Sequence, residues 1–184
     1  MPTVLVPLAE GFEELEAVTI IDVLRRADID VVTASLTNMN KVTSTRGVPI
    51  IADCLLNDVI DDSIDMMVLP GGQPGANHLN ADTRIHQLIT RLAKLDCYLA
   101  AICASPKVFA DNGVLDKHMA TAYPGSLSAE DYPEIELVDQ PIVIDGKFIT
   151  SNGPSSAIKF ALTLVEILTN SAARDMVEAH LLLK

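Results

Sequence analysis

The chain of 184 residues is long enough for one domain with a sizeable core, and we expect a single domain over residues 1–184. Apolar residues make up 49% of the chain and tryptophan is absent, which predicts a globular protein with a core of aliphatic side chains. The formal net charge of −12 argues against nucleic acid or an anionic membrane as the main partner, because both would repel the chain.

The apolar segments and the cysteines indicate the cellular setting. None of the apolar segments approaches the roughly 20 residues that span a bilayer, and the first residues lack the pattern of a signal peptide. The cysteines Cys54, Cys97 and Cys103 are odd in number and irregular in spacing, which argues against disulfides and against a zinc site. We therefore expect a cytoplasmic protein with reduced thiols and without a metal or cofactor.

Apolar segments of strand length alternate along the chain with helical patterns. Strands are expected over residues 3–8, 30–35, 65–69, 97–102 and 120–122. Helices are expected over residues 13–26, 80–95 and 106–112, from Pro154 to about Thr169, and over 172–183. This alternation predicts a mostly parallel sheet covered by helices on both faces.

Two segments carry hairpin patterns. Residues 41–53 fit two short strands about an Arg46-Gly47 turn, and residues 137–144 and 147–150 flank Asp145-Gly146, a strong hairpin signal. We therefore expect antiparallel additions to the parallel sheet.

Cys103 stands at the corner between the strand 97–102 and the helix that Pro106 opens. Ligands of open parallel sheets bind beyond the carboxyl ends of the strands, and the corner resembles the elbow that presents a nucleophile in hydrolases. The start of the helix would direct free N–H groups at the sulfur and favour the thiolate. The corner alone fits a buried structural cysteine equally well, and that is how we interpret Cys97 and Cys54.

Two other strand ends converge on the same edge of the sheet. In "AEGFEELEAV", Glu13 and Glu14 are explained by the preference for acids in a first helical turn, whereas Glu16 lies further into the helix and needs another explanation. In "LPGGQPGANHL", Gly71 and Gly72 allow backbone N–H groups to point at an anion. The spacing of a dinucleotide-binding loop is absent.

Three fragments together resemble one protein family. "EGFEELEAVTIIDVLRRADIDV", "DMMVLPGGQPGANHL" and "LAAICASPKVFADNGVL" look like the ThiJ/PfpI superfamily in its DJ-1-like group, and "GKFITSNGPSSAIKFALTLVEIL" resembles its closing hairpin and helix. The resemblance covers nearly the whole chain. It implies a flavodoxin-like α/β sandwich and a homodimer.

The resemblance also implies roles for individual residues. The reactive cysteine of the family falls on Cys103, and its acidic partner falls on Glu16, whose protonated carboxyl would donate a hydrogen bond to the sulfur. The oxyanion donors fall on Gly71, Gly72 and the Ala104 backbone N–H.

The pocket implied by the resemblance contains three further positions. An arginine near the family's site falls on Arg46. Tyr123 stands where some members place a histidine, and Asn152 replaces the arginine of a Ser-Arg-Gly-Pro corner, so a positive charge is missing there. Relatives with peptidase activity carry a histidine directly after the cysteine, and Ala104 at this position argues against a protease.

Two functions from different classes follow from the resemblance. One is a cysteine-dependent enzyme in which Cys103 attacks a 2-oxoaldehyde such as methylglyoxal, or an early glycation adduct, and Glu16 moves the proton (a glyoxalase or protein deglycase). The other is an oxidative-stress sensor and redox-regulated chaperone in which Cys103 is oxidised to a sulfinate. In either case no resolving cysteine is expected, because Cys97 lies at the opposite end of its strand.

Overall fold

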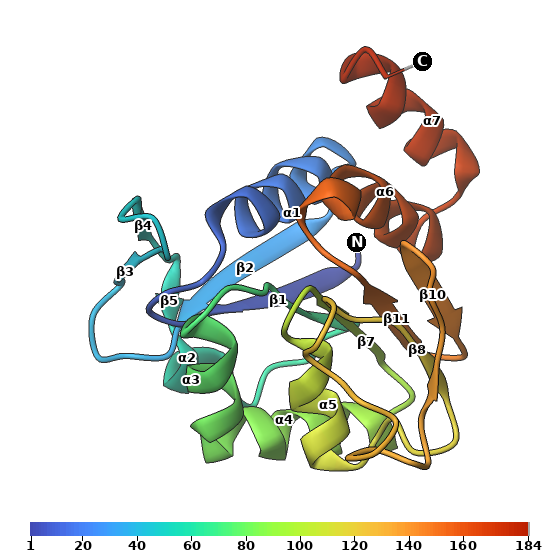
Figure 1. Cartoon of the computed structure of the whole chain (residues 1–184). Coiled ribbons are helices and arrows are strands. Elements are labelled where there is room, and N and C mark those ends of the chain that lie inside the picture. The colour runs from blue at the N-terminus through green and yellow to red at the C-terminus, as the bar shows by residue number, and fades with distance from the viewer. Residues whose placement is uncertain (184) are drawn as a thin grey trace.

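A seven-stranded sheet in the order β10-β11-β7-β6-β1-β2-β5 forms the centre of the computed structural model, which describes residues 1–183 (Figure 1). All neighbouring strands are parallel except β10 and β11. The strands of this sheet are β1 Thr3–Leu8, β2 Asp30–Ser35, β5 Cys54–Leu55, β6 Met66–Leu69, β7 Tyr98–Ile102, β10 Ile142–Asp145 and β11 Phe148–Ser151. The predicted mostly parallel sheet is therefore confirmed, as is the hairpin at Asp145-Gly146.

Two small pairs of strands lie outside the sheet. They are the antiparallel pair β3 Lys41–Thr43 and β4 Pro49–Ile51, and the parallel pair β8 Met119–Ala120 and β9 Glu136–Leu137. The first pair confirms the hairpin about Arg46-Gly47.

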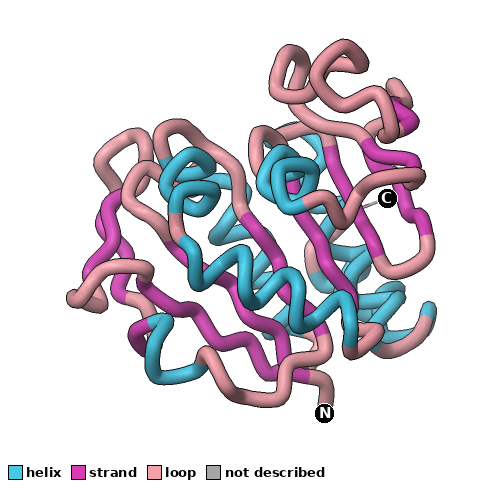
Figure 2. The backbone as a smooth tube through the Cα atoms, turned by 90° about the horizontal axis from the view of Figure 1, so that it is seen from below, coloured by secondary structure: helices cyan, strands magenta, loops and turns pink. Residues whose placement is uncertain are grey.

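Helices cover both faces of the sheet, as Figures 1 and 2 show. The helices are α1 Glu14–Arg26, α2 Leu56–Val59, α3 Gly75–Ala81, α4 Thr83–Lys94, α5 Pro106–Asn112, α6 Ala157–Leu168 and α7 Ser171–His180. On one face α1 packs against α6, and α7 packs on α6 further from the sheet, while α3, α4 and α5 lie on the other face.

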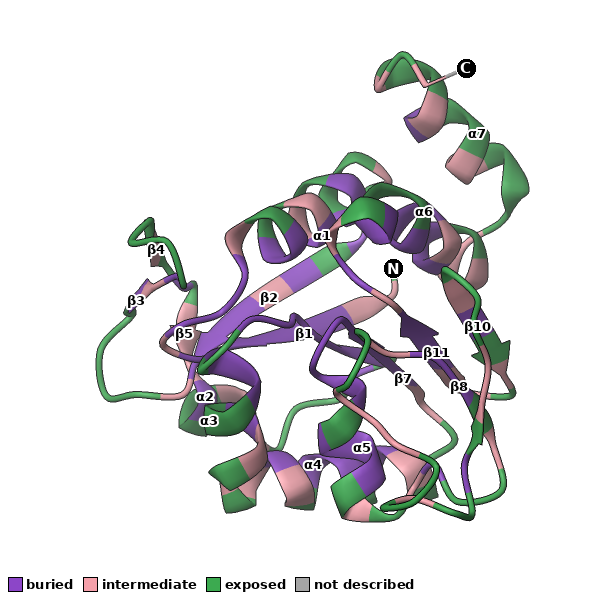
Figure 3. Cartoon of the chain, in the orientation of Figure 1, coloured by how far each residue is buried: buried purple, intermediate pink, exposed green. Residues whose placement is uncertain are grey.

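The two faces bury separate apolar clusters because successive strand residues point to opposite sides. On β1, Val4 and Val6 join the cluster beneath α1 and α6, whereas Leu5 joins the cluster beneath α4 and α5. Figure 3 shows the central strands coloured largely as buried between the two layers of helices. Strands buried on both faces are apolar at successive positions, which is why β6 and β7 have continuous apolar sequences.

The structure corrects several expected boundaries. The helix expected over 80–95 corresponds to α4, which begins only at Thr83, and its first two residues end the unexpected helix α3. Asp82 separates the two helices, and its side chain accepts a hydrogen bond from the Arg84 backbone N–H at the start of α4. The strand expected over 137–144 is wrong in its first part, since Leu137 pairs with Ala120 of β8 and the hairpin strand begins at Ile142.

The interpretation of Cys97 as a core residue is wrong, and Cys54, interpreted as a structural cysteine, is not fully buried either. Both are only partly buried, and each packs at the margin of the cluster beneath α4 and α5. Each stands at or just before the start of a strand, where the helices cover the sheet less completely.

Across residues 1–183, every helix is too short or too polar to traverse a lipid bilayer.

Candidate active site

Three loops meet at the carboxyl ends of the adjacent strands β7, β6 and β1. The chain leaves β1 in one direction toward β2 and later returns to place β6 on the other side of β1. Open parallel sheets bind their ligands at such a reversal of strand order. The loops after the three strands carry Cys103, the Gly71-Gly72 pair and the residues that lead into α1.

Cys103 occupies a strained corner directly after β7. Its φ of 64° lies in the left-handed region, which costs a non-glycine residue about 1–2 kcal/mol. Two backbone hydrogen bonds hold the corner, from the Cys103 N–H to the Ser151 carbonyl at 2.9 Å and from the Tyr123 N–H to the Cys103 carbonyl at 2.8 Å. The predicted elbow between strand and helix is confirmed.

Glu16 lies on the inward face of α1 and its side chain is buried, with 0% of the residue exposed to solvent. Its Oε2 accepts a hydrogen bond of 2.8 Å from the Gly71 N–H. Its carboxyl group faces the Cys103 side chain across Gly71 and raises the pKa of the thiol. The structure therefore brings the two principal site residues predicted from the sequence together.

Gly71 is the residue that permits this approach. A Cβ atom at this position would lie 2.5 Å from the Cys103 Cβ and 2.6 Å from the Glu16 Oε2, and both distances are too short for atoms in contact. Because the Gly71 N–H is bound to Glu16, it is not free to act as the oxyanion donor that the resemblance implied. The N–H groups of Gly72 and Ala104 lie near the sulfur instead, where they lower the pKa of the thiol.

Burial dominates the acidity of both groups. It raises the pKa of Glu16 to about 7, against the opposing effects of hydrogen bonds with Cys103 and Gly71. The pKa of Cys103 is raised to about 12 by burial, by the charge of Glu16 and by the hydrogen bond with it, and the N–H groups of Gly72 and Ala104 lower it only in part. Burial and the carboxylate thus oppose the effect that the start of the helix was expected to have on the thiol, and the direction of the shift favours the protonated sulfur.

At neutral pH and above, the pair shares a single proton. Two groups this close titrate as a unit, so the proton is either on the sulfur or on Glu16. The Glu16 Oε1 is buried and receives no hydrogen bond from any N–H or O–H group of residues 1–183, so it is the oxygen available to carry the proton. Transfer of this proton from the thiol to Glu16 creates a thiolate beside a neutral acid.

Glu13 contributes more than the sequence indicated. Its Oε2 accepts a hydrogen bond of 2.8 Å from the Glu16 N–H, and its own N–H donates to the Gly71 carbonyl at 2.8 Å. Glu13 thereby caps α1 and ties the start of the helix to the glycine loop. The spacing of three residues between Glu13 and Glu16, typical of a capping interaction, was the signal that could have identified this role.

The remaining predicted pocket residues have separate partners. Arg46 forms an ion pair of 3.3 Å with Glu13 through an otherwise exposed guanidinium group, so it reaches the support of the site and not the sulfur. Tyr123 contacts Cys103 through its backbone, while its side chain is half exposed. The Asn152 Oδ1 accepts a hydrogen bond of 3.1 Å from the Ser156 hydroxyl.

The described residues 1–183 hold no group of three or more His, Cys, Asp or Glu side chains placed to bind a metal ion. The site geometry is therefore that of a thiol, a carboxyl group and backbone amides.

Comparison with known proteins identifies the family. The DJ-1/PfpI family matches residues 2–167 of the chain. The chain belongs to the DJ-1/PfpI family. The resemblance noted in the sequence is thus confirmed, and with it the flavodoxin-like α/β fold.

Relatives in the DJ-1/PfpI family include proteins of different lengths. Protein dj-1beta of Drosophila melanogaster is 39% identical over 89% of this chain and 88% of its own length. Protein DJ-1 homolog B of Arabidopsis thaliana is 42% identical over 90% of this chain. The chain spans less than half the length of DJ-1 homologs A and B of Arabidopsis thaliana, 47% and 37% respectively.

Solved structures of DJ-1 proteins agree closely with this fold. Oxidized DJ-1 of Toxoplasma gondii has a TM-score of 0.93 at 38% identity and covers 99% of this chain and 98% of its own. DJ-1beta of Drosophila melanogaster has a TM-score of 0.94 at 36% identity and covers 100% of this chain and 98% of its own.

Proposed function

We propose that this protein is a cysteine-dependent enzyme that acts on 2-oxoaldehydes or early glycation adducts, with Cys103 as nucleophile and Glu16 as proton shuttle. The observation that carries the proposal is the contact between the buried Glu16 carboxyl and the Cys103 thiol, with two backbone N–H groups at the sulfur. A relative from Caenorhabditis elegans, 32% identical over 91% of each chain, is named glutathione-independent glyoxalase DJR-1.2, which supports this substrate class.

The first step forms a hemithioacetal. The Cys103 thiol gives its proton to the Glu16 carboxylate as the sulfur bonds to the aldehyde carbon, and the aldehyde oxygen then takes up that proton. A Glu16 pKa of about 7 suits this exchange, because a general acid or base works best when its pKa lies near the working pH. In established oxyanion sites one N–H donor is worth about 3–4 kcal/mol, and Gly72 and Ala104 offer two such donors beside the sulfur.

The following steps move two protons and add one water. Glu16 removes the proton from the carbon bonded to sulfur and delivers a proton to the neighbouring carbon, while the hydroxyl proton of the hemithioacetal passes to the former keto oxygen. The product is the thioester of a 2-hydroxy acid. The aldehyde carbon is oxidised and the keto carbon is reduced, so the step balances within the substrate. Water then cleaves the bond between carbon and sulfur, which releases the 2-hydroxy acid and restores the thiol.

The pH dependence of lactate formation from methylglyoxal tests this proposal. Below about pH 7 both groups of the pair are protonated and Glu16 cannot accept the thiol proton, so kcat/KM is expected to fall about tenfold for each pH unit. Above about pH 7 the rate is expected to level off. Lactate is measured enzymatically in quenched samples between pH 5 and pH 9.

Two results would contradict the proposed enzymatic mechanism. One is lactate formation no faster than in a heat-denatured sample at every pH. The other is a rate that does not change between pH 5 and pH 9, which would remove Glu16 from the mechanism.

A redox sensor is the second candidate, because the same groups suit an oxidised sulfur. Two molecules of peroxide convert a thiol to a sulfinic acid and leave two waters. The N–H groups of Gly72 and Ala104 would then hold one sulfinate oxygen, and protonated Glu16 would hold another. Cys97 precedes the opposite end of β7, so it is not positioned to form a disulfide with Cys103.

Mild peroxide treatment followed by peptide mass spectrometry tests the sensor. Cys103 is expected to gain two oxygen atoms before Cys54 or Cys97 is modified, although its residue is only 8% exposed and theirs are more accessible. Oxidation of Cys54 or Cys97 before Cys103 would contradict the sensor hypothesis.

A further inference from the structure

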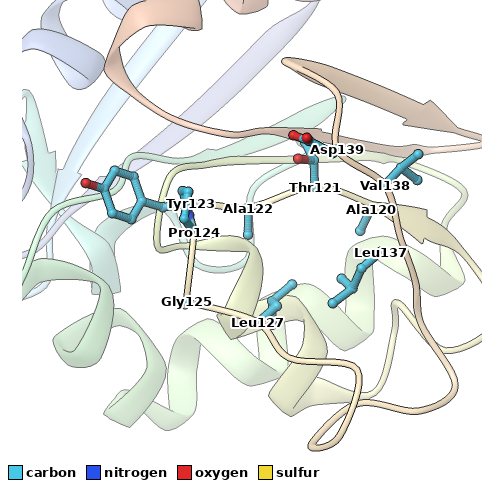
Figure 4. Close-up of a pocket in the computed structure, with 10 residues that line it drawn as sticks. All are labelled: Ala120, Thr121, Ala122, Tyr123, Pro124, Gly125, Leu127, Leu137, Val138 and Asp139. Atoms are coloured by element: carbon cyan, nitrogen blue, oxygen red, sulfur yellow. The ribbon is translucent and has the colours of Figure 1, made fainter.

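A pocket of about 400 Å³ lies beside the candidate active site, and neither Cys103 nor Glu16 lines it. Its walls come from residues 120–125, from Leu127 and from residues 137–139 (Figure 4). Pockets of about 300–1,000 Å³ are the usual size of small-ligand sites in proteins. The steps proposed for Cys103 and Glu16 make no use of this pocket.

The pocket is joined to the site by backbone hydrogen bonds. The Tyr123 N–H donates to the Cys103 carbonyl at 2.8 Å, so the residue that begins one end of the pocket is fixed to the reactive corner. The Thr121 N–H donates at 2.9 Å to the hydroxyl of Thr150, which pairs with Ala101 on β7. The wall of the pocket is therefore fixed to the backbone of the reactive corner.

The lining has an apolar side and a polar end. Leu127, Leu137 and Ala122 present hydrocarbon, whereas Thr121 and Asp139 add a hydroxyl and a carboxylate, drawn at the same edge of the pocket in the view of Figure 4. Within residues 1–183, no lysine, arginine or histidine pairs with Asp139, and neither of these side chains makes a hydrogen bond. Two polar groups thus remain available to a ligand.

We propose that this pocket binds the side chain of a lysine residue in the substrate. The methylene groups of lysine would lie on the apolar side, and the ammonium group would bind Asp139 and the Thr121 hydroxyl. A carboxylate excludes anionic ligands, and the net charge of −12 favours cations over the whole surface. This inference rests on the proposed function and narrows the substrate class to glycated peptides with a lysine beside the adduct.

Direct binding to the Cys103→Ser variant tests this inference without any turnover. The probes are N-acetyl-lysine methylamide, its Nε-acetylated form and the norleucine analogue, followed by NMR titration of the protein. The lysine probe is expected to shift resonances of residues 120–125 and 137–139 and to bind at least tenfold more tightly than the two neutral probes. Its affinity is expected to fall as salt is added, because the contact is between charges near the surface.

The second part of the test repeats the titration with Asp139→Asn. Asp116→Asn is the matched control, because Asp116 is also an exposed acid but lies outside the pocket. Asp139→Asn is expected to weaken the lysine probe at least tenfold, and Asp116→Asn to leave it unchanged. Equal binding of all three probes, or unchanged affinity in Asp139→Asn, would overturn the lysine site. Lactate formation from methylglyoxal by the wild-type protein would then still stand, so the two failures are distinguishable.

Discussion

Replacing Cys103 with serine is expected to lower the kcat/KM for lactate formation from methylglyoxal by at least about 1,000-fold, because a hydroxyl is a far weaker nucleophile than a thiol. Serine is nearly the same size, so the corner and its backbone hydrogen bonds to Ser151 and Tyr123 are expected to remain. The measurement is the steady-state rate at pH 8, with circular dichroism to verify the fold.

Cys97→Ser is the control for this experiment. Cys97 lies just before the amino end of β7, and its replacement removes a thiol without touching the candidate site. Its rate is expected to equal that of the wild-type protein. A Cys103→Ser protein that retained more than about a tenth of the wild-type rate would show that the sulfur is not the nucleophile.

Replacing Glu16 with glutamine is expected to slow lactate formation by about 100- to 10,000-fold, the usual contribution of a general acid or base. The amide oxygen can still accept the Gly71 N–H, so the loop geometry is expected to persist. The pKa of Cys103 is expected to fall below its wild-type value of about 12, because the negative charge beside the sulfur is gone. Ultraviolet absorbance of the thiolate measures this shift.

The same substitution is expected to stabilise the protein at high pH. The ordinary pKa of a glutamate carboxyl is 4.5, and the pKa of Glu16 in the folded protein is about 7, so between these pH values the folded state binds more protons than the unfolded state. The free energy of unfolding of the wild-type protein therefore falls as pH rises from about 4.5 to about 7 and loses nothing further from this group above that range. The difference of about 2.5 pH units corresponds to about 3 kcal/mol.

Urea unfolding at pH 4 and pH 8 measures this effect. Glu16→Gln is expected to be more stable than the wild type by up to about 3 kcal/mol at pH 8 and to differ little at pH 4. Glu130→Gln replaces an exposed acid and is the control, so its free energy of unfolding is expected to equal that of the wild type at both pH 4 and pH 8. A Glu16→Gln protein less stable than the wild type at pH 8 would mean that the folded state does not penalise the charge on Glu16.

The sequence by itself predicted the parallel sheet, its helices on both faces and both hairpins, because these depend on local periodicity and turn residues. It also singled out Cys103 and Glu16, since a cysteine at a strand end and an acid beyond the first helical turn are visible in one dimension. It missed the break between α3 and α4, because the helical sequence pattern runs on through Asp82. Only the hydrogen bond from the Arg84 N–H to the Asp82 side chain reveals that α4 starts there.

Only the tertiary structure decided the protonation of Cys103 and Glu16 and which backbone N–H groups lie near the sulfur. The start of a helix next to Cys103 pointed to a thiolate, but the depth of burial and the distance to Glu16 depend on packing between segments far apart in the chain, and they raise the pKa of both groups. The role of Gly71 likewise depends on three strands meeting at one edge, where its missing side chain leaves space for the sulfur and the carboxyl to approach.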